Sequence, residues 1–262
     1  MAKQILNVTD LSMHFGGIRA VDQVDLDINE GEIVALIGPN GAGKTTFFNC
    51  LTGIYNPTQG DIKLYQEGKK EARLNGLKPN QVTEKGMART FQNIRLFQKM
   101  TVLENVMIGR HCRTTSFIAG AIFRTRHNRR EEREIIERSY SILEKVGLEK
   151  HVNDLASNLS YGAQRRLEIA RALATDPFLL LLDEPAAGMN PQETKELDDL
   201  ITKIRDDGLA ILLIEHDMKL VMSISDRIFV MDYGKKIAQG TPQEIGDNPD
   251  VIKAYLGEAA DA

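Results

Sequence analysis

Nine residues, Gly38 to Thr46, constrain the fold of this chain more than any other stretch. They read Gly-Pro-Asn-Gly-Ala-Gly-Lys-Thr-Thr and fit the pattern G-x-x-x-x-G-K-[ST] at every position. An apolar run of strand length, residues 32–37, precedes them, and a helix-like segment, residues 46–51, follows. Strand, glycine loop and helix form the context that a phosphate-binding loop requires. The sequence therefore predicts a nucleoside triphosphate site.

Each part of this loop has an expected role. The predicted nucleotide-binding residues are Gly38, Pro39, Asn40, Gly41, Ala42, Gly43, Lys44, Thr45 and Thr46. Backbone N–H groups and the positive end of the following helix dipole would face the phosphates. Lys44 would hold the β- and γ-phosphates, and Thr45 would ligate Mg²⁺ through its hydroxyl. Upstream, Phe15 is either a platform for the adenine ring or a strand residue packed inward.

The pattern along the chain predicts an α/β protein. Short apolar alternation over residues 5–37 indicates antiparallel strands with tight turns, and the polar residues 55–90, rich in glycine and proline, favour surface strands and turns. Residues 93–160 shift to helical spacing, including a helix over 131–148. A helix capped by Ser160 runs to about residue 175, and Asn190 with Pro191 opens another. Strands at 178–183 and 209–214 alternate with these helices, which predicts a parallel sheet.

Four units follow from these shifts. Residues 1–92 form a nucleotide-binding core with an antiparallel β subdomain, and 93–160 a helical subdomain. Residues 161–240 complete the core, and 241–262 form a C-terminal helical tail.

Charged side chains follow two strands of the predicted parallel sheet. Asp183 and Glu184 end one strand, and His216 follows the next. Ligands of such sheets gather at the carboxyl ends of the strands. We expect Asp183 to accept Mg²⁺-bound water and Glu184 to act as general base for the attacking water. His216 would contact the γ-phosphate and orient Glu184 or that water.

These motifs, with two more, resemble the ATP-binding subunits of ABC transporters over nearly the whole chain. Gln92 stands in the Q-loop place, where the resemblance implies a role at Mg²⁺, and Ser160, Tyr161 and Gly162 stand in the signature place. The resemblance implies a P-loop NTPase (RecA-like) core, ATP and Mg²⁺ as cofactors, and a head-to-tail dimer. In that dimer the signature residues would act on ATP bound by the second ATPase subunit, whether identical or paralogous. A nucleoside or shikimate-type kinase would leave Ser160 and His216 unexplained.

Three positions depart from the family pattern. Tyr161 and Ala163 replace the third and fifth signature residues, which are usually glycine and glutamine, and Asn190 replaces the usual aspartate of the D-loop. We expect activity to survive these changes. Their effect on the rate of hydrolysis and on coupling between sites does not follow from the sequence.

Within the family, four segments are similar to the ATPase subunits of branched-chain amino-acid importers. They are residues 89–97, 184–191, 214–221 and 254–258. The implied partners are two integral membrane permeases and, indirectly, a solute-binding protein. Residues Leu96, Phe97 and Met100 would form an apolar groove for a permease helix or would pack inward. The alternatives are a lipopolysaccharide-export ATPase, which shares the Tyr-Leu-Gly ending, and a soluble ABC ATPase of DNA maintenance or translation.

Composition limits the remaining choices. The net charge of −4 supplies no attraction to nucleic acid, so we expect none as a partner. No segment resembles a signal peptide or a membrane span, and Cys50 and Cys112 have no metal or disulfide spacing, which favours a reducing cytoplasm. The resemblance implies a peripheral place on the cytoplasmic face of the inner membrane. The arginine-rich stretch 111–130 contacts lipid headgroups or a partner, or is a solvated loop or short hairpin.

Overall fold

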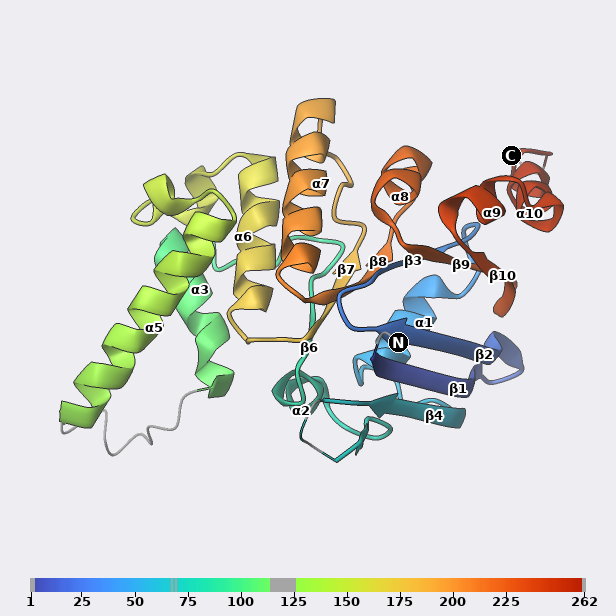
Figure 1. Cartoon of the computed structure of the whole chain (residues 1–262), viewed down its shortest axis with the longest axis horizontal. Coiled ribbons are helices and arrows are strands. Elements are labelled where there is room, and N and C mark those ends of the chain that lie inside the picture. The colour runs from blue at the N-terminus through green and yellow to red at the C-terminus, as the bar shows by residue number, and fades with distance from the viewer. Residues whose placement is uncertain (1–2, 67, 69, 114–125, 261–262) are drawn as a thin grey trace.

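A computed structural model describes residues 3–66, 68, 70–113 and 126–260 (Figure 1). The strands are β1 (Gln4–Phe15), β2 (Ile18–Asn29), β3 (Ile33–Ile37), β4 (Gln59–Leu64), β5 (Ala72–Arg73), β6 (Met87–Arg89), β7 (Leu179–Asp183), β8 (Ala210–Ile214), β9 (Arg227–Asp232) and β10 (Lys235–Gly240). The α-helices are α1 (Lys44–Leu51), α2 (Pro79–Glu84), α3 (Val102–Arg110), α5 (Arg126–Lys145), α6 (Tyr161–Leu173), α7 (Pro191–Asp206), α8 (Met218–Ile224), α9 (Pro242–Gly246) and α10 (Pro249–Ala260). None of the helices in these ranges is long and apolar enough to span a bilayer.

The centre of the molecule is a sheet with the order β10-β9-β3-β8-β7-β6, in which β9, β3, β8, β7 and β6 run parallel. β3, β7 and β8 are buried at every residue, which agrees with their apolar sequences, interrupted only by Asp183 at the end of β7. Because β3 lies between β8 and β9, the loop after β3 emerges beside the residues that follow β8 and β7. The predicted parallel sheet is confirmed, and it brings the three motif-bearing strand ends to one edge.

A second, antiparallel sheet has the order β2-β1-β4-β5. Helix α1 lies between this sheet and the parallel sheet (Figure 1). Phe47 and Phe48 of α1 are fully buried in a core that both sheets share, together with Leu6 of β1 and Leu36 of β3. The helix that begins at the phosphate-binding loop is therefore fixed from both sides by apolar packing.

Helices α6 and α7 lie on the other side of the parallel sheet from α1, and α3 and α5 pack beyond α6 (Figure 1). A second core joins Leu167 of α6 and Leu197 of α7 to Leu180 and Leu182 of β7. Ser160 Oγ caps α6 by accepting from Ala163 N at 3.3 Å, and Asn190 Oδ1 caps α7 by accepting from two backbone N–H groups. Both predicted helix starts are confirmed.

The segment 55–90 differs from the expectation of surface strands and turns. Leu64 of β4 and Val82 of α2 are buried in the shared core. β6 joins the parallel sheet by pairing with β7, Met87 opposite Leu179. The three residues of β6 are too few to show a periodic pattern, and their partner strand, β7, lies far along the sequence. The composition of segment 55–90 therefore wrongly predicted that these residues lie at the surface. Most of the arginine-rich stretch, residues 114–125, lies outside the described residues.

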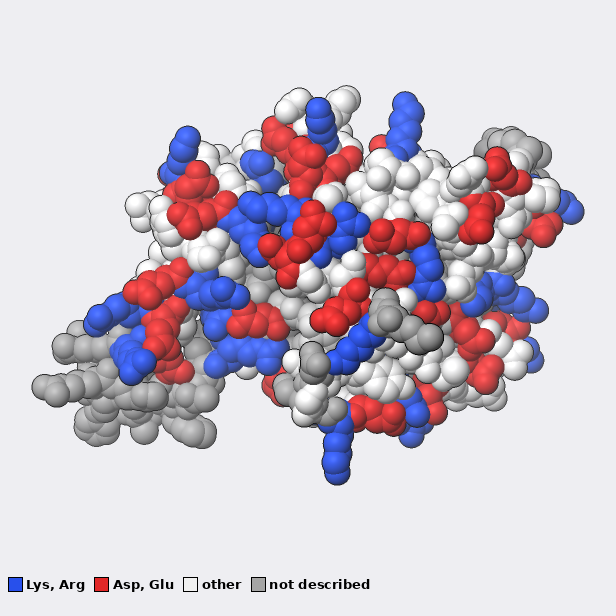
Figure 2. All heavy atoms as spheres, in the orientation of Figure 1, with Lys and Arg blue, Asp and Glu red and all other residues white. Residues whose placement is uncertain are grey.

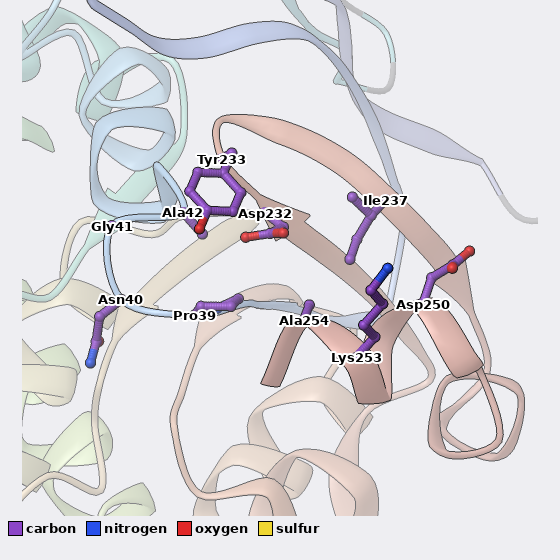
Figure 3. Close-up of a pocket in the computed structure, with 10 residues that line it drawn as sticks. All are labelled: Pro39, Asn40, Gly41, Ala42, Asp232, Tyr233, Ile237, Asp250, Lys253 and Ala254. Atoms are coloured by element: carbon purple, nitrogen blue, oxygen red, sulfur yellow. The ribbon is translucent and has the colours of Figure 1, made fainter. Parts of the chain in front are cut away.

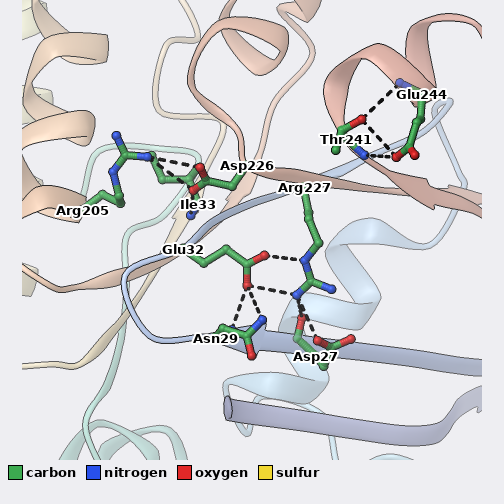
Figure 4. Close-up of polar contacts among 9 residues, drawn as sticks. All are labelled: Asp27, Asn29, Glu32, Ile33, Arg205, Asp226, Arg227, Thr241 and Glu244. Carbon is green, nitrogen blue, oxygen red and sulfur yellow. Dashed lines mark hydrogen bonds and ion pairs between the residues drawn. The ribbon is translucent and has the colours of Figure 1, made fainter. Parts of the chain in front are cut away.

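A polar cluster ties the antiparallel sheet to the parallel one (Figure 4). Arg227 at the start of β9 donates to Asp27 Oδ2 of β2 at 3.0 Å and to Glu32 Oε2 before β3 at 3.0 Å. Next to it, Asp226 Oδ2 accepts from Ile33 N at 2.8 Å. These contacts join segments about 200 residues apart in the chain, and they fix the start of β3 against β2 and β9.

Candidate functional site

The loop after β3 packs so closely that two of its residues must be glycine. Gly38 and Gly43 have φ angles of 149° and 97°. A Cβ atom at Gly38 would lie 2.0 Å from the carbonyl oxygen of Met231, and one at Gly43 would lie 2.3 Å from that of Ala20. These glycines let the loop pass between β2 and β9 without a clash.

Lys44 is the first residue of α1, and its side chain is turned back over the loop. Its Nζ donates to the carbonyl oxygens of Gly38 at 2.5 Å and Pro39 at 2.8 Å, and the residue is only 6% exposed. A cavity of about 220 Å³ lies in front of the loop, and Glu184 and His216 form its opposite wall. On the loop side it is lined by Asn40, Gly41, Ala42, Gly43, Lys44, Thr45 and Thr46. The size suits the phosphate part of a nucleotide, since whole-ligand pockets are usually about 300–1,000 Å³.

Glu184 is held at both carboxylate oxygens. Gln92 Nε2 donates to Oε2 at 2.7 Å, and His216 Nε2 lies 2.7 Å from Oε1. The backbone of Glu184 has a φ of 47°, an uncommon conformation for a residue other than glycine, and its N–H donates to Ile214 O of β8 at 2.9 Å. Glu184 lines the same cavity as the phosphate-binding loop, so its role as general base stays a prediction that this placement allows.

Asp183 is buried and paired with a residue that sequence reasoning did not single out for the site. Arg89 at the end of β6 donates to Asp183 Oδ2 at 2.6 Å, and the side chains are 9% and 6% exposed. The same guanidinium donates to Asn49 Oδ1 at 2.7 Å and Thr52 Oγ1 at 3.1 Å, both near the end of α1. Arg89 thereby holds the carboxylate of Asp183 in place through its Oδ2 atom. No short-range pattern marks this pair, because the two residues are 94 positions apart.

Glu215 is a second residue that the pattern did not assign. Its carboxylate is buried and accepts from Ala186 N at 2.7 Å and from His216 N at 3.0 Å. Burial raises the pKa of Glu215, and these backbone N–H groups oppose that rise. Glu215 therefore connects the loop after Glu184 to the backbone that carries His216. Its place between Ile214 and His216 is the only signal in the sequence.

The remaining predicted residues lie outside this cavity. None of the signature residues is among its described lining, and their action on another subunit's nucleotide stays a prediction. Phe15 is 42% exposed and makes an edge contact with Tyr55, with ring centroids 5.2 Å apart. It is therefore not packed inward as a core residue, and its role as an adenine platform stays a prediction.

A separate hollow of about 670 Å³ lies on the other flank of the loop (Figure 3). Pro39 and Ala42 line one side, while Tyr233 and Lys253 come from the β9–β10 turn and α10. It contains neither Lys44 nor Glu184, so we place the phosphates in the smaller cavity. On the face shown in Figure 2, basic and acidic side chains are interspersed, so this face offers no broad basic surface for nucleic acid.

Comparison with known proteins agrees with this geometry. The model of the family described as "ABC transporter" matches residues 21–187. The chain belongs to the ABC transporter family. A second family model, described as "Branched-chain amino acid ATP-binding cassette transporter", matches residues 235–261. Cassettes of this family are ATPases, and the α/β fold and ATPase class expected from the sequence are confirmed.

Individual relatives and structures cover almost the whole chain. The high-affinity branched-chain amino acid transport ATP-binding protein LivG of Salmonella typhimurium is 54% identical over 260 residues, which are 99% of this chain and 100% of that protein. The crystal structure of the ADP conformation of MJ1267, an ATP-binding cassette of an ABC transporter, superposes with a TM-score of 0.82 at 29% identity, covering 97% of this chain and 99% of that one. The dimeric structure of MJ0796, a bacterial ABC transporter cassette, gives 0.74 at 26% identity, covering 91% and 99%.

The ABC transporter family implies ATP, and the residues present fit it. Lys44 is buried within the glycine loop, and its ammonium group would bind phosphate oxygens. Glu184 lines the same cavity. The described residues contain no cluster of three or more histidine, cysteine or acidic side chains that could hold a metal by themselves.

Proposed function

We propose that this chain is the ATP-hydrolysing subunit that powers import of branched-chain amino acids through partner permeases. The observation that carries the proposal is the 54% identity, over essentially the full length of both chains, with LivG of Salmonella typhimurium. The family model over residues 235–261 covers the Tyr-Leu-Gly ending and favours amino-acid import over the lipopolysaccharide-export alternative.

In this proposal, the residues around the small cavity divide the chemistry of hydrolysis. Lys44 would neutralise the β- and γ-phosphates, and Thr45 with Asp183 would hold Mg²⁺, partly through water. Bound Mg²⁺ would supply charge neutralisation at the phosphates. Glu184 would accept the proton of the attacking water, and its hydrogen bonds to Gln92 and His216 would keep the carboxylate aimed at that water. Gln92 would approach Mg²⁺ only by exchanging its bond to Glu184.

The functional unit in this proposal is a head-to-tail pair of ATPase subunits. Ser160 is exposed at the N-terminal end of α6, and Gly162, two residues later, is buried. Backbone N–H groups at this helix end would face the γ-phosphate bound by the second subunit. Dimeric assembly is known for the MJ0796 cassette. The second subunit here would be a copy or a paralogue.

The permease would dock beside α3 and α6 on the membrane-facing side. A cavity of about 520 Å³ there is lined by Phe91, Phe97 and Ile108, with Arg95 and Arg171 at its edges. Phe97 is 49% exposed and so is available to a partner, whereas Leu96 packs against the helical core. The subunit would lie on the cytoplasmic face of the membrane through this contact, and a solute-binding protein would engage the permeases on the other side.

The test combines copurification with uptake. The Glu184→Gln variant with ATP should accumulate closed dimers and retain two multi-span permeases when detergent-solubilised membranes of the host are purified through it. Proteoliposomes of that complex, loaded with ATP and supplied with the binding protein, should take up labelled leucine with the wild-type chain and not with Glu184→Gln. Recovery of only soluble or nucleic-acid-bound partners, or uptake independent of Glu184, would refute the transport function.

A further inference from the structure

Helix α6 carries a buried ion pair outside the nucleotide cavity. Arg165 and Glu168 lie one turn apart, with Nη1 of the arginine 2.9 Å from Oε2 of the glutamate, and their side chains are 0% and 1% exposed. Burial raises the pKa of Glu168, and the Arg165 guanidinium opposes that rise. Two charges are rarely withdrawn from water this fully unless further hydrogen bonds hold them. The additional hydrogen bonds of Arg165 and Glu168 therefore indicate the structural role of the pair.

The pair is hydrogen-bonded to the loop that follows β6. Arg165 Nη1 donates to the carbonyl oxygen of Phe91 at 2.7 Å, and Nη2 donates to that of Gln92 at 2.8 Å. Glu168 Oε1 accepts from Arg95 N at 3.3 Å. The first half of this loop, from Phe91 to Arg95, is thus hydrogen-bonded to α6, and Gln92, whose side-chain amide donates to Glu184, is bonded directly.

The same helix begins at Ser160, five residues before Arg165. At 1.5 Å per residue, Arg165, which is bonded to the loop, lies about 7.5 Å along the helix axis from Ser160. Tyr161 adds a third connection: its hydroxyl lies 3.4 Å from Arg165 Nη2, and its ring lies 3.4 Å from where a Cβ of Gly188 would be. Gly188 belongs to the loop after Glu184. The departure of Tyr161 from the usual glycine therefore has a physical consequence, since glycine could not make either contact.

We propose that Arg165 is a positioning residue that links the Q-loop residue Gln92 of one subunit to Ser160, which acts at the second subunit's site. A shift of Gln92 upon nucleotide binding would then carry the start of α6 with it, because the guanidinium bonds backbone rather than a mobile side chain. Glu168 fixes the orientation of that guanidinium. A lysine could keep the charge but could not bond both carbonyl oxygens and Glu168 in this fork geometry. The inference rests on the proposed head-to-tail dimer.

The test uses the full-length Glu184→Gln chain, which separates binding from turnover. Arg165→Met alone would leave Glu168 buried without its cation, so the pair Arg165→Met/Glu168→Leu is the main variant, with Arg165→Lys beside it. The matched control is Arg166→Met on the same helix, because Arg166 pairs with Glu196 of α7 and not with the loop. Circular dichroism and the thermal midpoint check folding, a fluorescent ATP analogue gives the affinity of the monomer, and sedimentation measures ATP-dependent dimers.

We expect the double variant to bind ATP within about twofold of the parent and to dimerise at least about tenfold more weakly, a loss of about 1.4 kcal/mol. Arg165→Lys should fall between, and Arg166→Met should match the parent. Dimerisation equal to that of the parent, or an equal loss of ATP binding and dimerisation, would overturn the inference. If the Glu184→Gln parent itself forms no dimer with ATP, the proposed dimer fails, and the inference fails with it.

Discussion

Replacing Arg89 with methionine should destabilise the fold by about 3–5 kcal/mol. The change removes the cation from a pair whose side chains are both less than a tenth exposed, and so leaves the Asp183 carboxylate buried without a partner. Breaking a buried pair in this way typically costs about 3–5 kcal/mol. The lost bonds to Asn49 and Thr52 place the expected value in the upper part of that range.

A double-mutant cycle separates the interaction energy between Arg89 and Asp183 from the other effects of the two substitutions. Asp183→Asn keeps the shape but leaves the buried Arg89 guanidinium without its anion; because Arg89 stays bonded to Asn49 and Thr52, the cost should lie near the lower end of the same range, about 3 kcal/mol. Arg89→Met/Asp183→Asn removes the charge that Arg89→Met strands, and should be less damaging than the sum of the single changes by about 2 kcal/mol.

The assay is urea denaturation at constant temperature, followed by far-ultraviolet circular dichroism. Arg138→Met is the matched control, because Arg138 pairs with Asp176 across 3.3 Å with both side chains largely in solvent, and it should cost less than about 1 kcal/mol. If Arg89→Met is no worse than Arg138→Met, or the cycle is additive, the buried pair does not hold Asp183 in the way described.

The other predictions concern the cavity and a buried carboxyl group. Lys44→Ala should abolish ATP binding, measured by calorimetry, because it removes the single buried cation of the loop; unchanged affinity would place the phosphates elsewhere. Glu184→Gln should keep ATP affinity and lower the rate of phosphate release by at least about 10²-fold, and normal turnover would remove the assignment of this residue as general base. Asp198 has its pKa raised to about 6 by burial and by the neighbouring carboxylates of Asp199, Asp217 and Glu215. Since the folded state binds this proton more tightly than the unfolded state, the stabilising effect is present below about pH 4 and is lost as the pH rises through about 6. Asp198→Asn should therefore raise the free energy of unfolding at about pH 8, by no more than about 1 kcal/mol for this partly exposed group, and change it little at about pH 4, as measured by urea denaturation; an equal gain at both pH values would contradict this.

Local patterns in the sequence determined the parts of the site that depend on neighbours in the chain. The glycine loop between an apolar strand and a helix, the caps at Ser160 and Asn190, and the carboxylates at the end of β7 all follow from spacing over a few residues. Such features are governed by backbone conformation and hydrogen bonds within one or two turns, so the residues themselves carry the information.

Tertiary structure alone decided which of these parts touch. The parallel sheet places β6 beside β7, and only this brings Arg89 to Asp183 across 94 positions of sequence. The hydrogen bond from Arg165 to the carbonyl oxygen of Gln92 likewise depends on how α6 packs against the sheet, and no periodicity in the sequence predicts it. A buried ion pair is specified by the burial of both partners and the geometry between them, which exist only once the two cores have formed. The sequence alone therefore predicts the chemistry of the site, and the packing of sheet and helices determines which of its residues contact one another.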